Sequence, residues 1–192
     1  MLLDQVPRNC YRGDSSSVVF TFLDPLSLDL AQTAIQRRVY TTNPELRWNF
    51  TYRFWLILPL IHSESLDVHS RIEPFFLDPM IADIESLIKG STETDDGSAE
   101  RKKVMAVLQK QPEAGNFLTK GQREQMEKHT VILRRFGRYP HRNGPMGREM
   151  KPDEQKYLDE GGDTFAPPKS DEEKAKWEAE REEERKRAAG ES

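Results

Sequence analysis

The chain has 192 residues, a formal net charge of −4, a charged fraction of 32% and a mean hydropathy of −0.80. This length fits one domain with a modest core, and the high polarity indicates that part of the chain lies outside that core. The negative charge disfavours general nucleic-acid binding, and a single cysteine, Cys10, excludes an intramolecular disulfide. No uninterrupted apolar run has membrane-spanning length and no secretory signal opens the sequence, so we expect a soluble cytoplasmic protein.

Helix signals recur along the chain, whereas strand signals are scarce. Asp24-Pro25 and Asp78-Pro79 each fit an N-cap followed by a first-turn proline, and each pair therefore predicts a helix start. The second helix should end at Gly90. The buried stripe of the first helix is predicted to be Leu26, Leu30, Ala31, Ala34 and Ile35. The inward residues of the second are predicted to be Ile81, Ile84, Leu87 and Ile88.

Three further helices are predicted in the second half of the chain. Thr119 and Gln122 have capping-box spacing, which predicts the start of a helix that Gly137 should end. A last short helix follows Pro152 and stops at the Gly161-Gly162 pair. A shorter helix after the polar loop of residues 90–98 is expected to carry Val104, Val107 and Leu108.

The segment 48–61 fits two interpretations. Alternation typical of a strand is seen for Trp48, Phe50, Tyr52 and Phe54. One helical face would instead contain Trp48, Tyr52, Trp55 and Leu56. Because helical signals flank the segment on both sides, we predict a helix that is kinked or broken at Pro59.

Residues 167–192 form a tail of interleaved acidic and basic residues in which Trp177 is the one large apolar side chain. Pairs such as Glu172–Lys176 stabilise a helix by about 0.2–0.5 kcal/mol each, but the tail has almost nothing to bury. We predict a solvated, fraying helix after the Pro167-Pro168 break, with partner binding as the alternative. The folded domain is therefore assigned to residues 1–166.

Arginines gather in one predicted loop. Residues 134–148 hold five arginines and a histidine and no acidic residue, and residues 6–13 repeat the pattern of a proline, an Arg-Asn pair and a further arginine. Guanidinium groups and amides set on turns suit an anionic ligand, and they suit the carbonyl groups of the loop itself equally well. The candidate ligand-binding residues of this loop are Arg135, Arg138, Arg142, Asn143 and Arg148.

The beginning of the chain offers a second group of candidates. Asp4, Gln5, Arg8 and Asn9 would present an acid, an amide and a guanidinium at one helix end. A local i,i+4 ion pair between Asp4 and Arg8 explains both residues without a ligand, and Asn9 has the alternative role of ending a helix.

Histidines supply the candidate catalytic groups. His62 lies near Glu64, and this pair suits proton transfer near neutral pH. The alternative is that Ser63 caps the next helix and His62 bonds a carbonyl group. His129 shares a helical stripe with apolar residues, which is typical of a buried core histidine; in the functional interpretation it joins His62 and His141 in one cleft. The spacing of His62, Glu64, Asp67 and His69 matches no standard metal site, so no metal is predicted.

Three blocks of sequence resemble domain-of-unknown-function family 924. The blocks are Leu2-Leu-Asp-Gln-Val-Pro-Arg-Asn9, Leu58-Pro-Leu-Ile-His-Ser-Glu64 and Arg135-Phe-Gly-Arg-Tyr-Pro-His-Arg-Asn143. The resemblance implies an all-helical, tetratricopeptide-like fold over residues 1–165 and implies no particular activity. Because family members usually carry helices before the first block, it also implies that this chain lacks an N-terminal part.

The predicted fold is accordingly all-α: a tetratricopeptide-like array of antiparallel helices, truncated at its N-terminus and followed by a charged tail. Two functions stay open. The first is a pocket for an anionic small molecule, in which His62 and His141 act as acid or base and Glu64 orients a histidine. The anion would be held by Arg8, Arg138 and Arg142.

The second function is a helical scaffold that binds a peptide or protein partner, with the same residues serving as structural clamps. Neither a Walker loop, a nucleotide-binding glycine motif nor a nucleophile elbow occurs in the sequence. We therefore predict no cofactor, and we expect neither a membrane nor nucleic acid as a partner.

Overall fold

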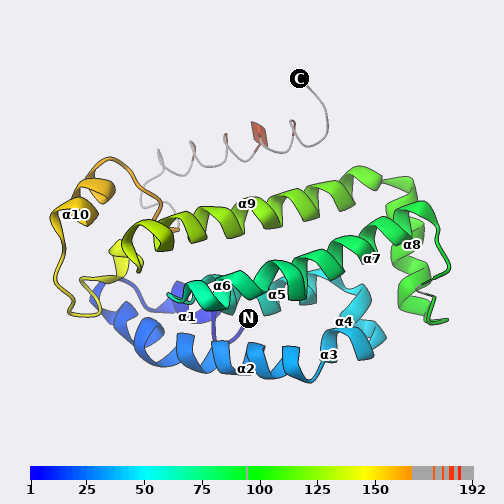
Figure 1. Ribbon diagram of the computed structural model, residues 1–192, viewed down its shortest axis with the longest axis horizontal. Helices are drawn as coiled ribbons and strands as arrows, with labels where there is room; N and C mark the ends of the chain where they lie inside the picture. Colours follow the sequence, from blue (N-terminus) through cyan, green and yellow to red (C-terminus); the bar gives the residue numbers. More distant parts are fainter. Residues whose placement is uncertain (94, 166–174, 176–178, 180–181, 184–185, 187–192) are drawn as a thin grey trace.

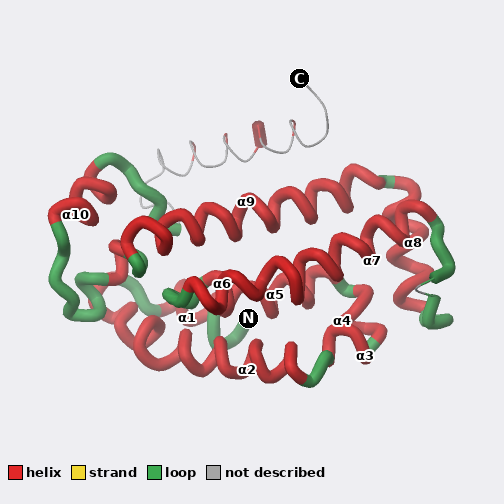
Figure 2. The backbone as a smooth tube through the Cα atoms, viewed as in Figure 1, coloured by secondary structure: helices red, strands yellow, loops and turns green. Residues whose placement is uncertain are grey.

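The computed structural model describes residues 1–93 and 95–165, together with residues 175, 179, 182, 183 and 186. Within these residues all regular structure is helical and no strand occurs, so the all-α prediction is confirmed (Figure 2). The five isolated tail residues are helical and exposed. The rest of the tail prediction for residues 167–192 lies outside the described residues.

The long helices form a row in which neighbours run in opposite directions (Figure 1). In this row α2 packs against α5, α5 against α6, and both α6 and α7 against α9. The predicted helical array is therefore present, while tetratricopeptide-like pairing remains a prediction. The helices are α1 (Gln5–Cys10), α2 (Asp24–Gln36), α3 (Val39–Thr42), α4 (Pro44–Trp48), α5 (Phe50–Ile61), α6 (Leu66–Ile72), α7 (Asp78–Lys89), α8 (Ala99–Lys110), α9 (Pro112–Phe136) and α10 (Pro152–Asp159). Shorter turns are η1 (Gly13–Ser16), η2 (Val19–Leu23), η3 (Glu73–Leu77) and η4 (Pro140–Arg142).

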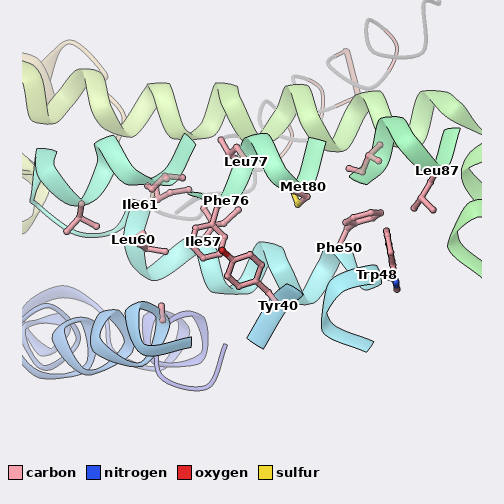
Figure 3. Close-up of a cluster of buried hydrophobic side chains, with 14 of the residues drawn as sticks. Tyr40, Trp48, Phe50, Ile57, Leu60, Ile61, Phe76, Leu77, Met80 and Leu87 are labelled. Atoms are coloured by element: carbon pink, nitrogen blue, oxygen red, sulfur yellow. The ribbon is translucent and has the colours of Figure 1, made fainter. Parts of the chain in front are cut away.

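The main hydrophobic core lies along α5 and the η3–α7 helix (Figure 3). Ile57 of α5 and Leu77 of η3 are fully buried, and Phe76 stacks on Tyr40 with ring centroids 4.9 Å apart. The Tyr40 hydroxyl donates a hydrogen bond of 3.0 Å to the carbonyl oxygen of Phe75. The aromatic hydroxyl is thus satisfied inside the core, which fixes the short α3 helix against η3.

The helix interpretation of segment 48–61 is confirmed, but the expected break is in the wrong place. The chain breaks at Asn49, whose side chain accepts a hydrogen bond from the Tyr52 backbone N–H and caps α5. Pro59 lies inside α5 without interrupting it. Because α5 ends at Ile61, only one short stretch of helix follows the proline and little hydrogen bonding is lost.

The N-cap prediction for Asp24 and Asp78 is wrong, because both residues lie inside continuous helices. Each follows a π turn, η2 or η3, in which the aspartate N–H bonds the carbonyl five residues earlier: Asp24 to Val19 and Asp78 to Glu73. The proline that follows each aspartate has no N–H to donate, and the wider turn accommodates its ring. Neither carboxylate is used as a cap, and that of Asp24 serves the site described below.

The predicted stripe of α2 is only partly correct. Ala31 is buried, whereas Leu26 and Leu30 are 45% and 60% exposed; Phe22 of η2 is 65% exposed.

Among the described residues, one continuous helix, from Gly13 to Gln36, is long and apolar enough to cross a membrane by length and composition alone. A core helix or an N-terminal signal passes the same test, so the predicted location stays a prediction.

Two of the remaining helices begin or pack differently from the prediction. α9 begins at Pro112 and not near Thr119, whose hydroxyl instead bonds the Asn116 carbonyl within the helix. α9 ends at Gly137 as predicted, with a left-handed φ of 72°. In α8 Leu108 is buried, but Val107 is 54% exposed and does not face the core. α10 lies in the predicted place.

Two glycines of α9 give a matched test of its packing. A methyl group on Gly115 would lie 2.8 Å from Cγ2 of Ile84 and 3.1 Å from Cδ1 of Ile88, whereas one on Gly121 would meet nothing within 4 Å. Gly121→Ala should therefore stabilise the protein by about 0.5–1 kcal/mol through helix propensity. Gly115→Ala should destabilise it by about 1–2 kcal/mol, because overpacking exceeds that gain. Urea unfolding of both variants checks this, and equal effects would contradict the close packing of α9 on α7.

Candidate functional site

A largely buried cluster of charged and aromatic side chains lies at the end of the array where the loop after α9 comes close to the beginning of the chain (Figure 1). The segments that supply it are far apart in the sequence: α1, the η2–α2 helix, and the ends of α5 and α9 together with η4. We call it the Arg/His cluster. Its members are Asp4, Arg8, Phe20, Asp24, His62, His129, Tyr139, His141 and Arg142.

Asp4 orients His62 within this cluster. The Asp4 carboxylate is 1% exposed and lies 2.6 Å from Nδ1 of His62, while the amide of Gln5 donates to its other oxygen at 2.7 Å. An ionised carboxylate at Nδ1 places the proton on that nitrogen and leaves Nε2 as the acceptor. No hydrogen bond within the described part of the chain uses His62 Nε2. The contact with Asp4 therefore orients the His62 imidazole so that Nε2 is available for acid–base chemistry.

Asp24 contacts two arginines, one through each of its carboxylate oxygens. Its Oδ1 accepts a hydrogen bond of 2.6 Å from Arg8, and its Oδ2 lies 3.4 Å from the guanidinium of Arg142. Arg8 also reaches Asp4 at 3.2 Å. Two guanidinium groups thus share two carboxylates, so the cluster is close to neutral as long as its histidines are neutral.

Arg142 is held between two aromatic rings. Its guanidinium carbon lies 4.7 Å from the ring centroid of Phe20 and 4.6 Å from that of Tyr139. The residue is 5% exposed, and burial lowers its pKa from the ordinary value while the charge of Asp24 opposes that shift. The cation–π contacts replace part of the hydration that burial removes.

Two histidines of the cluster contact Tyr139, and the third contacts one of those two. His129 and His141 lie 5.9 Å and 5.7 Å from its ring, and His62 lies 5.9 Å from His129. The Tyr139 hydroxyl donates a hydrogen bond of 2.6 Å to the Ile61 carbonyl, and burial raises the pKa of this phenol. Tyr139 is therefore a neutral ring that contacts both His129 and His141.

Burial keeps these histidines neutral. It lowers the pKa of His129 to about 3, partly opposed by the hydrogen bond to the Gln125 carbonyl, and it lowers the pKa of His141 to about 3 together with the charges of Arg142 and Arg8. Burial also lowers the pKa of His62, although Asp4 acts in the opposite direction. For Asp4 burial alone raises the pKa, but the contact with His62 and the charge of Arg8 outweigh it and lower the pKa.

Several buried polar atoms of the cluster have no hydrogen-bond partner within the described chain. They are Nε of Arg8, Nε of Arg142, Nε2 of His129, Nδ1 of His141 and Oδ2 of Asp24, which has only its ionic contact with Arg142. Native proteins rarely leave such atoms unsatisfied, and a group of them in one place is typical of a site that water or a ligand completes.

Glu64 clamps the loop that carries the cluster and does not contact a histidine. Its carboxylate accepts a hydrogen bond of 2.8 Å from the Tyr139 backbone N–H and two from Arg148, at 2.6 and 3.1 Å. Burial raises the pKa of Glu64, but the bonds from Arg148 and Tyr139 outweigh it and lower the pKa. The carboxylate in contact with His62 is that of Asp4 and not that of Glu64.

A second clamp holds the same loop from α10. The buried Glu154 carboxylate binds Arg138 at 2.6 and 2.8 Å, and it accepts further bonds of 2.9 Å from Asn143 Nδ2 and the Lys151 N–H. Arg138 also donates to the carbonyl of Glu149. For Arg138, Asn143 and Arg148 the observed contacts are therefore those of loop clamps, the alternative that the sequence left open.

Six of the predicted site residues belong to the Arg/His cluster: Asp4, Arg8, His62, His129, His141 and Arg142. Gln5 donates to Asp4, and Glu64, Arg138, Asn143 and Arg148 are the clamps of the loop. The other two predicted residues belong to neither group. Asn9 is exposed at the end of α1, and Arg135 is exposed on α9 with its guanidinium over Phe136. Arg135 lines a surface hollow of about 470 Å³ between α9 and α10 that includes no member of the Arg/His cluster. The residues that the sequence did not indicate are Phe20, Asp24 and Tyr139.

The alternatives for the neighbouring residues are also resolved. Ser65, not Ser63, caps α6, and the histidine that bonds carbonyl groups is His69, at 3.0 Å from those of Ile61 and Ser63. Asp67 is exposed and pairs with Arg71. Within the described residues no group of three or more His, Cys, Asp or Glu side chains is arranged to hold a metal ion.

Comparisons with known proteins place the chain in a family without adding an activity. Neither the curated proteins nor the solved structures give a match. The family described as a bacterial protein of unknown function (DUF924) matches residues 1–162, which include every member of the Arg/His cluster, and the chain belongs to this family.

Proposed function

We propose that the Arg/His cluster binds a small anionic molecule and that His62 exchanges a proton with it. The observation that carries this proposal is the Asp4–His62 contact of 2.6 Å beside two arginines that share Asp24. An oriented imidazole, paired guanidinium groups and buried donors without partners are the parts that acid–base sites for anions require.

The charge balance supports a coupled mechanism. Asp4 and Asp24 already balance Arg8 and Arg142, so an incoming anion leaves one negative charge uncompensated in a buried place. Protonation of His62 restores the balance, because Asp4 stabilises the imidazolium at Nδ1 and Nε2–H then points to a bound acceptor. The anion is therefore bound together with about one proton, and affinity should rise roughly tenfold for each pH unit of acidification above the pKa of His62.

The test is a thermal-shift screen against phosphate, sulfate and short carboxylic acids, followed by calorimetry of the anion that raises the melting temperature most. Arg8→Ala should weaken that anion by tenfold or more, since it removes a charge-assisted donor, and Arg8→Lys should restore part of the affinity. Arg71→Ala is the matched control, because Arg71 pairs with Asp67 on the exposed face of α6.

Two outcomes would contradict the proposal. One is a screen in which no anion raises the melting temperature; the other is an anion whose affinity Arg8→Ala and Arg71→Ala change equally. Calorimetry in two buffers of different ionisation enthalpy counts the protons taken up, and a count of zero would remove His62 from the mechanism while leaving the anion site.

The second candidate is the scaffold, favoured by the exposed apolar side of the η2–α2 helix. Phe22, Leu26 and Leu30 stand one turn apart and are largely exposed, a spacing that suits the apolar ridge of a partner helix. The segment from Gly13 to Gln36 contains no lysine or arginine, so it is poorly suited to an anionic membrane surface. Under this alternative Leu30→Lys would abolish binding of the partner helix and leave anion binding unchanged.

A further inference from the structure

Phe165 covers the Arg/His cluster from the outside. Its ring lies parallel to that of His129, with centroids 3.6 Å apart and an interplanar angle of 8°. The edges of the same ring meet Tyr139 at 6.3 Å and His141 at 6.4 Å, both nearly perpendicular. The ring therefore fills a slot whose floor is His129 and whose walls are Tyr139 and His141.

The backbone holds Phe165 in an unfavourable conformation. Its φ of 54° is in the left-handed region, which is unfavourable for a residue with a side chain, and the residue is 37% exposed. The segment reaches this position after Gly161, which has a φ of 81°. A ring placed at such a cost over the cluster, while still in contact with solvent, is well suited to leave the slot.

The ring is also chemically mismatched to what it covers. His129, which is 6% exposed, has its Nδ1 bonded to the Gln125 carbonyl but its Nε2 without a partner, and Nδ1 of His141 has none either. A phenyl group has no polar atom to offer them. A planar ring that carries polar substituents would keep the stack and satisfy these nitrogens.

We infer that Phe165 occupies a subsite for the planar ring of the ligand, so that the anion of the proposed function is an aromatic or heteroaromatic carboxylate. Its ring stacks on His129 after Phe165 swings out, and its carboxylate reaches Arg8 and Arg142. Arg142 lies 4.6 Å from the face of the same Tyr139 ring whose edge meets His129, so the ring slot and the arginines adjoin. This inference rests on the proposed function.

The test compares wild type with Phe165→Ala for four probes: benzoate, cyclohexanecarboxylate, acetate and phenol. Phe165→Ala opens the slot, so benzoate should bind this variant at least tenfold more tightly than wild type. Cyclohexanecarboxylate, which has the same charge but a puckered ring, should gain less than threefold, and acetate should not change. Phe117→Ala is the control. It removes an exposed phenylalanine that lies on α9, and it should leave all four affinities unchanged.

The outcomes separate the subsite from the anion site. Equal affinities of Phe165→Ala for benzoate and cyclohexanecarboxylate, or a benzoate affinity equal to that of wild type, would overturn the ring subsite. Arg8-dependent acetate binding would still support the proposed function in that case. Equal binding of phenol and benzoate to Phe165→Ala would overturn the anion site and the carboxylate class. A cooperative melt of Phe165→Ala near that of wild type shows that the variant is folded.

Discussion

Acidification from pH 7 to pH 5 should lower the free energy of unfolding by about 3 kcal/mol. In the native protein burial lowers the pKa of His129 and His141 to about 3, whereas an unfolded histidine titrates near pH 6.5. Between these values the unfolded chain binds protons that the native state does not. The contribution to stability is therefore complete above about pH 6.5 and is lost as the pH falls toward 3.

The size of this loss in stability follows from the difference between the numbers of protons bound by the unfolded and the native protein. For a buried histidine that stays neutral, the contribution to the free energy of unfolding falls by about 2 kcal/mol between pH 7 and pH 5. The slope is 1.36 kcal/mol for each pH unit below the unfolded pKa. His129 should contribute nearly all of this. His141 is only partly buried and should contribute less. Burial lowers the pKa of His62 and His69 as well, so both act in the same direction.

Urea unfolding at pH 7, 6 and 5 measures this loss, and His129→Gln isolates one of its causes. Glutamine does not titrate, so the variant should lose about two thirds of the pH dependence. Parallel pH profiles for the variant and the wild type would show that His129 is protonated in the native state. A saturating anion should reduce the loss in wild type, because a bound anion favours protonated histidines in the cluster.

The helical fold could be predicted because its signals are local. Gly137 ends α9 and α10 follows Pro152, since a left-handed terminus and a first-turn proline depend on single residues. The Asp-Pro pairs gave a wrong N-cap prediction for the same reason, because their signal is local as well. A capping motif has the same local pattern whether or not a π turn precedes it, and only the tertiary structure shows that Asp24 and Asp78 continue a helix.

The candidate site could be predicted in part. The clustered arginines and the histidine of the loop after α9 pointed to it, and the helical stripe of His129 correctly faced inward. The Asp24-Pro25 pair has the local pattern of a helix cap, and that pattern does not indicate that the carboxylate pairs with Arg8 and Arg142. No local pattern indicates Tyr139 and Phe20, because their role as supports for Arg142 depends on contacts across the fold.

The loop residues of the site are positioned by carboxylates that come from elsewhere. Glu64 follows α5 and Glu154 lies on α10, yet both bind the segment that carries Tyr139, His141 and Arg142. The arginine-rich sequence alone leaves two uses for each guanidinium, ligand or clamp. The distant acid decides between them: Arg138 and Arg148 each meet one of these carboxylates, while Arg8 and Arg142 share Asp24 inside the cluster.

Glu154→Gln should destabilise the protein by about 3 kcal/mol and weaken anion binding with it. The carboxylate is fully buried and accepts four hydrogen bonds, two from Arg138 and one each from Asn143 and Lys151. Glutamine has nearly the same shape, but its NH₂ group faces donors and the charge that balances Arg138 is lost. At roughly 2–4 °C for each kcal/mol, the melting temperature should fall by about 6–12 °C.

Asp159→Asn is the matched control, since Asp159 is exposed on the same helix and accepts one hydrogen bond from Gln155. It should change stability by less than about 0.5 kcal/mol. The bonds from Arg138 lower the pKa of Glu154 to about 2, below an unfolded value near 4.3. The stability that Glu154 supplies is complete above that unfolded value and is lost as the pH falls toward 2, so wild type and Glu154→Gln should converge in acid. A difference between them that stays constant from pH 7 to pH 3 would mean that the charge is unimportant and that the shape of the side chain alone holds the loop.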